Sequence, residues 1–207
     1  MSDVRVSEAE VARWYAGKTF ATDWTSWHFP NWQNWLAPYR ARAMRVLEIG
    51  SWEGRSALFF LNYLPRAELV CIDTFEGGQE HQAADDAEVF LAQVEKTFDA
   101  NTSAFANRIE KVKARSADAL AQLGLTNRRF DLAYIDGSHR AADVYSDGAL
   151  TWPLIEPGGL VIFDVYELEL TSNPLDNVRT GVDAFLGAFE GQYCLLHRGY
   201  QVAIVKP

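Results

Sequence analysis

The sequence predicts an α/β fold, with a mostly parallel sheet, helices on both faces and one reversed strand. Two observations lead to this class. Short apolar runs closed by glycine or aspartate alternate with segments whose apolar residues follow helical spacing, as expected for a parallel sheet covered on both sides. The last two apolar runs are separated only by a short turn at Arg198-Gly199, and such a tight connection makes neighbouring strands antiparallel.

The expected elements follow this alternation along the chain. Helices are predicted where apolar residues recur every three or four positions, and glycine or proline ends several of them. A turn is expected at Pro157-Gly158-Gly159. The expected strands are 45–50, 68–73, 109–113, 130–136, 160–164, 193–196 and 200–205, and the expected helices are 8–15, 56–64, 84–98, 117–123, 141–155 and 181–189.

The composition is that of a globular protein large enough to bury a core. The chain has 207 residues, of which 48% are hydrophobic and 23% charged. Its net charge of -9 and its lack of Lys/Arg runs argue against a nucleic-acid partner and against an anionic membrane surface. The polar N-terminus and the absence of a long apolar run lead us to expect a soluble, cytoplasmic protein. Both cysteines, Cys71 and Cys194, are expected to be buried free thiols.

Aromatic residues crowd residues 1–42, which we expect to form a helical or irregular cap. Five of the seven tryptophans fall in the first 35 positions, namely Trp14, Trp24, Trp27, Trp32 and Trp35. Only residues 8–15 have a helical pattern, with Ser7 as the N-cap. Large aromatic side chains bury much area either in a packed structural cap or in a wall over a flat substrate, and both interpretations stay open. Exposed tryptophans in this segment would favour a homodimer.

Acidic residues close four of the expected strands. Glu48, Asp73, Asp136 and Asp164 each lie at or near the carboxyl end of a strand, where open α/β sheets bind their ligands. An acid after a strand often caps the next helix, so each residue alone has a structural explanation. Four carboxylates at one edge would repel one another unless they bind cations or accept hydrogen bonds from hydroxyl groups. We therefore predict a ligand site at this edge.

The segment after the first strand reads Glu48-Ile49-Gly50-Ser51-Trp52-Glu53-Gly54-Arg55-Ser56. Its glycines would let the backbone approach a ligand and open a helix whose N–H groups point at that ligand. The pattern is not G-x-G-x-x-G, and Trp52 and Glu53 make a poor diphosphate cradle, which disfavours a nicotinamide or nucleotide-sugar enzyme. Asp73 follows Gly50 by 23 residues, near the offset at which an acid binds ribose hydroxyls.

This segment resembles the first motif of class I S-adenosylmethionine-dependent methyltransferases, in the form found in the catechol O-methyltransferase-like group. The later segments 115–120, 134–139 and 157–164 are similar in order and spacing to further motifs of that group. The resemblance covers residues 43–207, and four motifs in sequence make it specific. It implies a Rossmann-like seven-stranded sheet whose last strand is antiparallel. It also implies an S-adenosylmethionine-binding methyltransferase domain at 43–207. If that domain is an O-methyltransferase, we expect the aromatic cap at 1–42 to line the acceptor pocket.

The resemblance further implies a set of cofactor-binding residues. Ser56 resembles the serine that holds the cofactor carboxylate at a helix start, and Asp73 the acid that accepts both ribose hydroxyls. Ser116 and Ala117 resemble the pair beside the adenine, although a longer polar side chain is usual at the second position. A helix N-cap is the alternative role for Ser116. The implied cofactor-binding set is Glu48, Gly50, Ser51, Ser56, Asp73, Ser116, Ala117 and Asp136.

Metal-dependent members of the group bind magnesium through an acid after the fourth strand and an acid pair after the fifth. Those positions hold Asp136, Asp164 and Val165 in this chain, and valine cannot ligate. Magnesium can be held by one or two carboxylates together with water and substrate. A magnesium site at Asp136 and Asp164 is thus weakened but stays open, with Glu167 as a substitute ligand.

The catalytic residues implied by the resemblance are His139 and Asp136. His139 stands three residues after Asp136, where the catechol enzymes place a basic catalytic residue, and an imidazole can take a proton from a hydroxyl near neutral pH. A structural loop histidine is the alternative. His28, His81 and His197 show no partner pattern and are expected to be structural or on the surface. We expect methyl transfer to a hydroxyl of a small-molecule acceptor, with a non-catalytic cofactor-binding or interaction module as the alternative.

Overall fold

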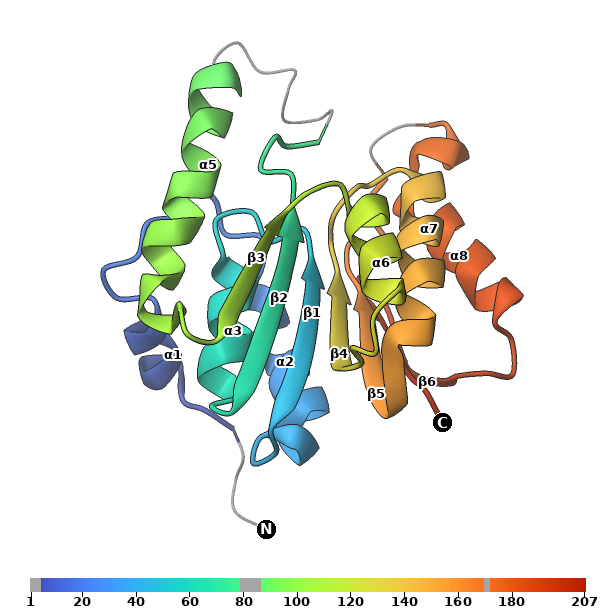
Figure 1. Cartoon of the computed structure of the whole chain (residues 1–207), viewed down its shortest axis with the longest axis horizontal. Helices are drawn as coiled ribbons and strands as arrows, with labels where there is room; N and C mark the ends of the chain where they lie inside the picture. Colours follow the sequence, from blue (N-terminus) through green and yellow to red (C-terminus); the bar gives the residue numbers. More distant parts are fainter. Residues whose placement is uncertain (1–4, 79–86, 170–171) are drawn as a thin grey trace.

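A seven-stranded sheet forms the centre of the structure, with helices packed on both of its faces (Figure 1). The computed structural model describes residues 5–78, 87–169 and 172–207. Strand order is β3-β2-β1-β4-β5-β7-β6, and every pairing is parallel except the two that involve β7. The strands are β1 (Met44–Ile49), β2 (Ala67–Asp73), β3 (Ile109–Lys113), β4 (Phe130–Ile135), β5 (Ile155–Phe163), β6 (Cys194–Arg198) and β7 (Val202–Val205). The predicted sheet, with its last strand antiparallel, is confirmed.

Two apolar cores lie between the sheet and its helical layers. On one face, buried side chains of α2 (Phe29–Leu36), α3 (Arg55–Tyr63) and α5 (Ala87–Thr102) pack on the strands. On the other face, α6 (Ser116–Gly124), α7 (Ala141–Thr151) and α8 (Val178–Ala188) complete the second core. In Figure 1, α6, α7 and α8 lie over the half of the sheet that contains β4 and β5. Parallel strands buried on both faces explain why their sequences are continuous apolar runs.

The N-terminal segment is part of the first core. Its helix α1 (Glu8–Trp14) starts where Ser7 accepts a hydrogen bond from the Glu10 N–H, as predicted. Helix α2, in which Phe29, Trp32 and Leu36 are buried, was not predicted from the sequence. Trp32 is fully buried and stacks on Phe60 with ring centroids 5.0 Å apart. Burial of such large rings stabilises the contact between cap and sheet more than helix propensity does.

Three predicted boundaries differ from the structure around β5. The helix expected over 141–155 stops at Thr151, and a 3₁₀ turn, η4 (Trp152–Leu154), leads directly into β5. The turn expected at 157–159 belongs to β5, because Gly158 N–H donates to the Lys206 carbonyl and Lys206 N–H donates to the Gly159 carbonyl. Gly158 has a φ of +79°, and the pairing with β4 shifts register here, so the glycine pair forms an irregularity inside the strand.

Other differences are smaller and have simple causes. The helix expected over 84–98 runs as α5 to Thr102, and its expected first residues 84–86 lie outside the described residues. The helix expected from 181 begins at Val178. Cys71 is buried as expected, but Cys194 is exposed because β6 is the edge strand of the sheet.

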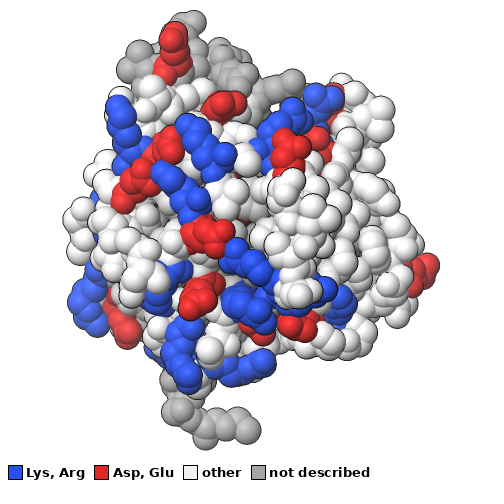
Figure 2. Space-filling view, in the orientation of Figure 1, with Lys and Arg blue, Asp and Glu red and all other residues white. Residues whose placement is uncertain are grey.

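Charged side chains are interleaved on the face drawn in Figure 2, where acids and bases alternate over α5, β3 and the loops beside them. Lys111 contacts Glu95 and Asp99 at 3.0 and 2.7 Å, and Lys113 contacts Glu95 at 2.6 Å.

In the parts of the chain that the structure describes, no helix combines the length and hydrophobicity required to cross a membrane.

Replacing Gly50 with alanine is expected to destabilise the fold. Gly50 has a φ of +83°, and an added Cβ would lie 2.0 Å from the backbone oxygen of Asp136. Alanine is strained in the left-handed backbone conformation, and its Cβ would push the end of β1 away from the loop after β4. Together these effects should lower the free energy of unfolding by at least about 2 kcal/mol. Gly187→Ala in α8 is the control, since its Cβ would meet nothing within 4 Å. Urea unfolding of both variants makes the comparison, and equal midpoints would contradict the expectation.

Candidate functional site

The carboxyl ends of four parallel strands bring the predicted acids together at one edge of the sheet. Asp73 is the last residue of β2, Asp136 follows β4, and Asp164 follows β5. Glu48, one residue before the end of β1, is fully buried, and Asp164 is 3% exposed. The charges of Glu48 and Asp73 are both within reach of Asp136. The edge therefore holds a row of acids in which Glu48 and Asp164 are buried, whereas Asp73 and Asp136 are partly exposed.

Asp73 is held rigidly by the glycine-containing loop after β1. Its Oδ2 accepts hydrogen bonds from the N–H groups of Ser51 and Trp52, both at 2.7 Å, and its Oδ1 accepts one from Phe75 N–H at 2.7 Å. Trp52 and Phe75 adopt positive φ angles of 48° and 57°, so the loops are bent to aim these N–H groups at the carboxylate. Burial raises the pKa of Asp73, and the three N–H donors oppose that rise. A carboxylate has about four acceptor positions, so a ligand hydroxyl can still donate to it.

Glu48 forms the buried floor beside that loop. The thiol of Cys71 donates to its Oε2 at 3.3 Å, whereas Oε1 and the neighbouring Ser51 Oγ have no hydrogen-bond partner among the described residues. Burial raises the pKa of Glu48 to about 7, against the opposing effect of the Ser56 hydroxyl. The hydroxyls of Ser51 and Ser56 both oppose that rise, so the floor consists of one carboxyl surrounded by small hydrogen-bonding groups.

Two helices begin at the same edge without a side-chain cap. Gly54 is the N-cap of α3 with a φ of 81°, and Arg115 is the N-cap of α6; neither side chain hydrogen-bonds to the helix start. Ser116 is therefore the first helical residue rather than the cap, with Ala117 next to it. Ser56 lies in the first turn of α3 and is buried. Uncapped N–H groups at a helix start favour an anionic or acceptor group of a ligand.

A hydrogen-bonded network joins the acids at the ends of β4 and β5. The Tyr134 hydroxyl lies between Asp136 and Asp164, with its oxygen 3.0 Å from Asp136 Oδ2 and in contact with Asp164 Oδ2. Val165 N–H donates to Asp164 Oδ1 at 2.6 Å. Burial raises the pKa of Asp164, and the nearby charge of Asp136 raises it further. The two predicted metal-binding acids are thus adjacent, and a phenol connects them.

His139 and Asp136, the two implied catalytic residues, lie close to each other. The imidazole Nε2 lies 3.8 Å from Asp136 Oδ1, and the His139 side chain is 17% exposed. The loop that carries it is fixed by Ser138, whose hydroxyl donates to Asp143 at 2.7 Å. His139 can therefore reach solvent or a bound acceptor from a defined position.

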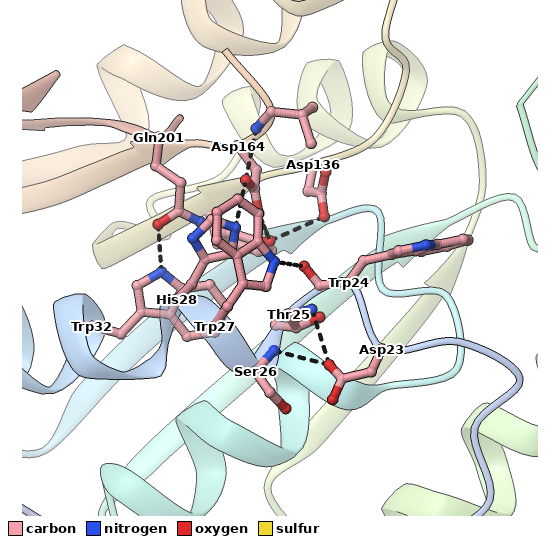
Figure 3. Close-up of polar contacts among 12 residues, drawn as sticks. Asp23, Trp24, Thr25, Ser26, Trp27, His28, Trp32, Asp136, Asp164 and Gln201 are labelled. Atoms are coloured by element: carbon pink, nitrogen blue, oxygen red, sulfur yellow. Dashed lines mark hydrogen bonds and ion pairs between the residues drawn. The ribbon is translucent and has the colours of Figure 1, made fainter. Parts of the chain in front are cut away.

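His28 lies against the acid edge, a position that the sequence did not reveal. It was expected to be structural or on the surface; its side chain is 3% exposed, and its Nε2 lies 3.4 Å from Asp164 Oδ1 (Figure 3). Burial lowers its pKa to about 4, so the ring is neutral near pH 7. The residue lies at the start of α2, beside the buried Trp32, and no local sequence pattern indicates its contact with Asp164. His81 lies outside the described residues. His197 lies in the edge strand β6, where it packs on Trp35.

Aromatic side chains from the cap border the acid edge. Trp27 lies over His28 with ring centroids 3.9 Å apart, and it packs edge-on against Tyr200 at 4.5 Å. Trp24 approaches Trp52 at 5.9 Å. Trp24 and Trp27 are 53% and 56% exposed. Figure 3 shows Trp27 beside His28 and near Asp164, with Trp24 to one side of the two acids, so exposed apolar rings lie next to the acids.

The donor set offers a magnesium ion few free oxygens. Both Asp164 oxygens already contact protein donors, Val165 brings no ligand, and Glu167 is exposed. Across the described residues, no group of three or more His, Cys, Asp or Glu side chains is arranged to hold a metal. Magnesium prefers about six oxygens in octahedral geometry, and Asp136 alone offers an outward carboxylate here.

The sequence of this chain matches a known family over residues 47–166, described as a methyltransferase domain. A curated relative, the mycinamicin VI 2''-O-methyltransferase of Micromonospora griseorubida, is 26% identical over 145 residues. That alignment covers 67% of this chain but 31% of the relative, so the chain spans about a third of the length of that protein.

Solved structures share the fold. The MycE methyltransferase from the mycinamycin pathway, in complex with Mg, SAH and mycinamycin VI, superposes with a TM-score of 0.65 at 20% identity, covering 94% of this chain and 52% of that one. The O-methyltransferase from Bacillus cereus in complex with SAH has a TM-score of 0.62 at 18% identity. The alignment covers 95% of this chain and 88% of that one. The O-methyltransferase TomG from Streptomyces achromogenes, in complex with SAM, has a TM-score of 0.61 at 22% identity. The alignment covers 84% of this chain and 77% of that one. The Rossmann-like fold is thereby confirmed.

Asp147 is a buried acid beneath the site that the sequence analysis did not consider. It lies in α7 and is 1% exposed, and neither carboxylate oxygen has a hydrogen-bond partner among the residues described. Its Oδ2 faces Gly137 in the loop that carries His139. Burial raises the pKa of Asp147 to about 7, and the Ser116 hydroxyl opposes this. The acid therefore lies between the middle of α7, the start of α6 and the loop that carries His139.

Asp147→Asn is expected to change how stability depends on pH. The folded carboxyl keeps its proton to about pH 7, whereas the unfolded one loses it near 3.8, so ionisation destabilises the wild type as pH rises through this window. Asparagine cannot ionise, and the variant should gain roughly 1–3 kcal/mol over the wild type between about pH 5 and pH 8. Urea unfolding at the two pH values measures this gain. The exposed Asp118→Asn is the control, and parallel curves for wild type and Asp147→Asn would refute the expectation.

Proposed function

Because the chain belongs to the methyltransferase-domain family, we propose that it transfers a methyl group from S-adenosylmethionine to a hydroxyl of a small molecule. The observation that carries the proposal is the acid edge, where Asp73 is fixed by three backbone N–H groups beside two uncapped helix starts. The mycinamicin relative is named as an O-methyltransferase, and structural neighbours were solved with SAH or SAM. The non-catalytic alternative gains no support from these relatives.

The residues at this edge fit the chemistry of S-adenosylmethionine. Asp73 would accept the ribose hydroxyls, and Glu48 with Ser51 would meet the methionine end through the unpartnered Oε1 and Oγ. Ser56 at the start of α3 would hold the carboxylate, and Ser116 with Ala117 would lie beside the adenine. Gly50 allows the β1 and β4 loops to approach one another, which leaves no room for a side chain. When bound, this cofactor supplies a methyl group already activated by its sulfonium charge.

We assign proton removal to His139 and its orientation to Asp136. A hydroxyl in front of His139 Nε2 would lose its proton to the imidazole, and the carboxylate 3.8 Å away stabilises the resulting imidazolium. The rigid loops contribute more, because holding acceptor and methyl donor in line can supply about 7–11 kcal/mol of the barrier. The charge of Asp136 also discourages an anionic acceptor from binding.

We place the acceptor between the acid edge and the N-terminal cap, residues 1–42. The exposed indoles of Trp24 and Trp27 offer a flat apolar wall, and His139 and Asp136 offer the polar end. An acceptor with one apolar face and a hydroxyl at its border fits this arrangement. A homodimer and a cytoplasmic location stay predictions.

Titration with S-adenosylhomocysteine tests cofactor binding. The wild type should release or absorb heat with one site per chain, and Asp73→Asn should raise the Kd at least about tenfold, because an amide cannot accept two charge-assisted hydrogen bonds. Asp99→Ala, a surface acid on α5 that pairs with Lys111, should bind like the wild type. Absence of binding by the wild type at millimolar ligand would reject the proposal.

His139→Gln should lower kcat by roughly 10²–10⁴-fold while leaving the Kd for S-adenosylhomocysteine unchanged. Glutamine keeps polarity and approximate size but cannot take the proton. His197→Gln, in the edge strand β6, is the matched control and should keep the wild-type rate. Rates with a panel of hydroxylated acceptors provide the measurement. Wild-type kcat in His139→Gln would identify His139 as a structural loop residue.

A further inference from the structure

We infer that the Tyr134 hydroxyl, rather than a divalent cation, joins the two carboxylates at the acceptor end of the site, and that it positions Asp136 for His139. The inference deepens the proposed function and rests on it only for the role of His139. It begins from the network at the ends of β4 and β5, in which a single phenol oxygen contacts one carboxylate oxygen of each acid.

Both oxygens of Asp164 are already engaged by groups of the protein. Its Oδ1 accepts the Val165 N–H at 2.6 Å and lies 3.4 Å from His28 Nε2, while its Oδ2 contacts the Tyr134 hydroxyl. Val165 has a φ of 49°, which is unusual for a β-branched residue and turns its N–H back onto the carboxylate. A cation would have to displace these contacts inside a pocket where Asp164 is 3% exposed.

Tyr134 is placed by the strand and locked by its neighbours. It lies two residues before Asp136, so both side chains emerge on the same face of β4. The ring is fully buried, 5.1 Å from Trp32 and 5.5 Å from Phe60 in edge-on contacts. Only the hydroxyl reaches the acids. The phenol thus has little freedom to leave the position between the two carboxylates.

The arrangement leaves Asp136 with one engaged and one available oxygen. Its Oδ2 contacts the Tyr134 hydroxyl at 3.0 Å, and its Oδ1 points to His139 Nε2 at 3.8 Å. The hydrogen bond on one side fixes the rotation of the carboxylate and so the direction of the other oxygen. Tyr134 and Asp164 are positioning residues in this scheme, because they act on the acceptor through Asp136 and His139.

Manganese titration followed by electron paramagnetic resonance tests the absence of a metal site without requiring turnover. Mn²⁺ is the probe, added to the full chain with and without S-adenosylhomocysteine. We expect no stoichiometric binding up to about millimolar Mn²⁺, where a site of two or more carboxylates would bind. One Mn²⁺ per chain that is lost in Asp164→Asn would overturn the inference. This readout is independent of methyl transfer, so its outcome is separate from that of the proposed function.

Tyr134→Phe tests the positioning role. It should lower kcat about 10- to 100-fold with an unchanged Kd for S-adenosylhomocysteine, because small displacements of catalytic groups have effects of that size. Tyr63→Phe is the matched control: Tyr63 is also fully buried, and its hydroxyl donates to the Gln33 carbonyl away from the acids. An equal fall in kcat for both variants would overturn the positioning role. If Tyr134→Phe does not fold, Asp164→Asn takes its place in the same comparison.

Discussion

The repulsion between carboxylates that share the carboxyl edge of the sheet governs how the structure around that edge is built. Parallel strands necessarily end together, so Glu48, Asp73, Asp136 and Asp164 converge. Each buried acid is given donors by residues close to it. Backbone N–H groups hold Asp73, and the Cys71 thiol meets Glu48. Strained loop conformations at Trp52, Phe75 and Val165 direct N–H groups at these acids. The fold thus stores strain where it needs fixed acceptors.

Several contacts couple the N-terminal cap to this edge. Arg55 at the start of α3 pairs with Asp23 at 2.6 Å and lies over the rings of Tyr15 and Phe20. Trp32 donates its indole N–H to Gln201 at 2.9 Å, next to β7. His28 approaches Asp164 from the same helix start. The segment that borders the proposed acceptor therefore shares its packing with the segment that holds the acids. A change of acceptor specificity in this protein would have to preserve that packing.

The sequence predicted the structure best where a residue pattern is compatible with only one type of element. Apolar runs ending in acids located β1, β2, β4 and β5, and the short turn near Gly199 identified the reversed strand. The tryptophan-rich segment was harder, because Phe29, Trp32 and Leu36 have helical spacing but stand among other aromatics that blur it. His28 and Tyr134 were missed because their partners are distant in sequence. Alternation along β4 could have placed Tyr134 beside Asp136, whereas the His28–Asp164 contact depends on how α2 packs and leaves no local pattern.

A crystal structure of the complex with S-adenosylhomocysteine tests the central claim most directly, since that claim is geometric. The account predicts one nucleoside across the carboxyl edge, with its ribose hydroxyls within hydrogen-bond distance of Asp73. The sulfur should face the space between Asp136 and His139, and the Tyr134 hydroxyl should remain between Asp136 and Asp164. A ligand bound elsewhere, with Asp73 contacting only its own loop, would contradict the account.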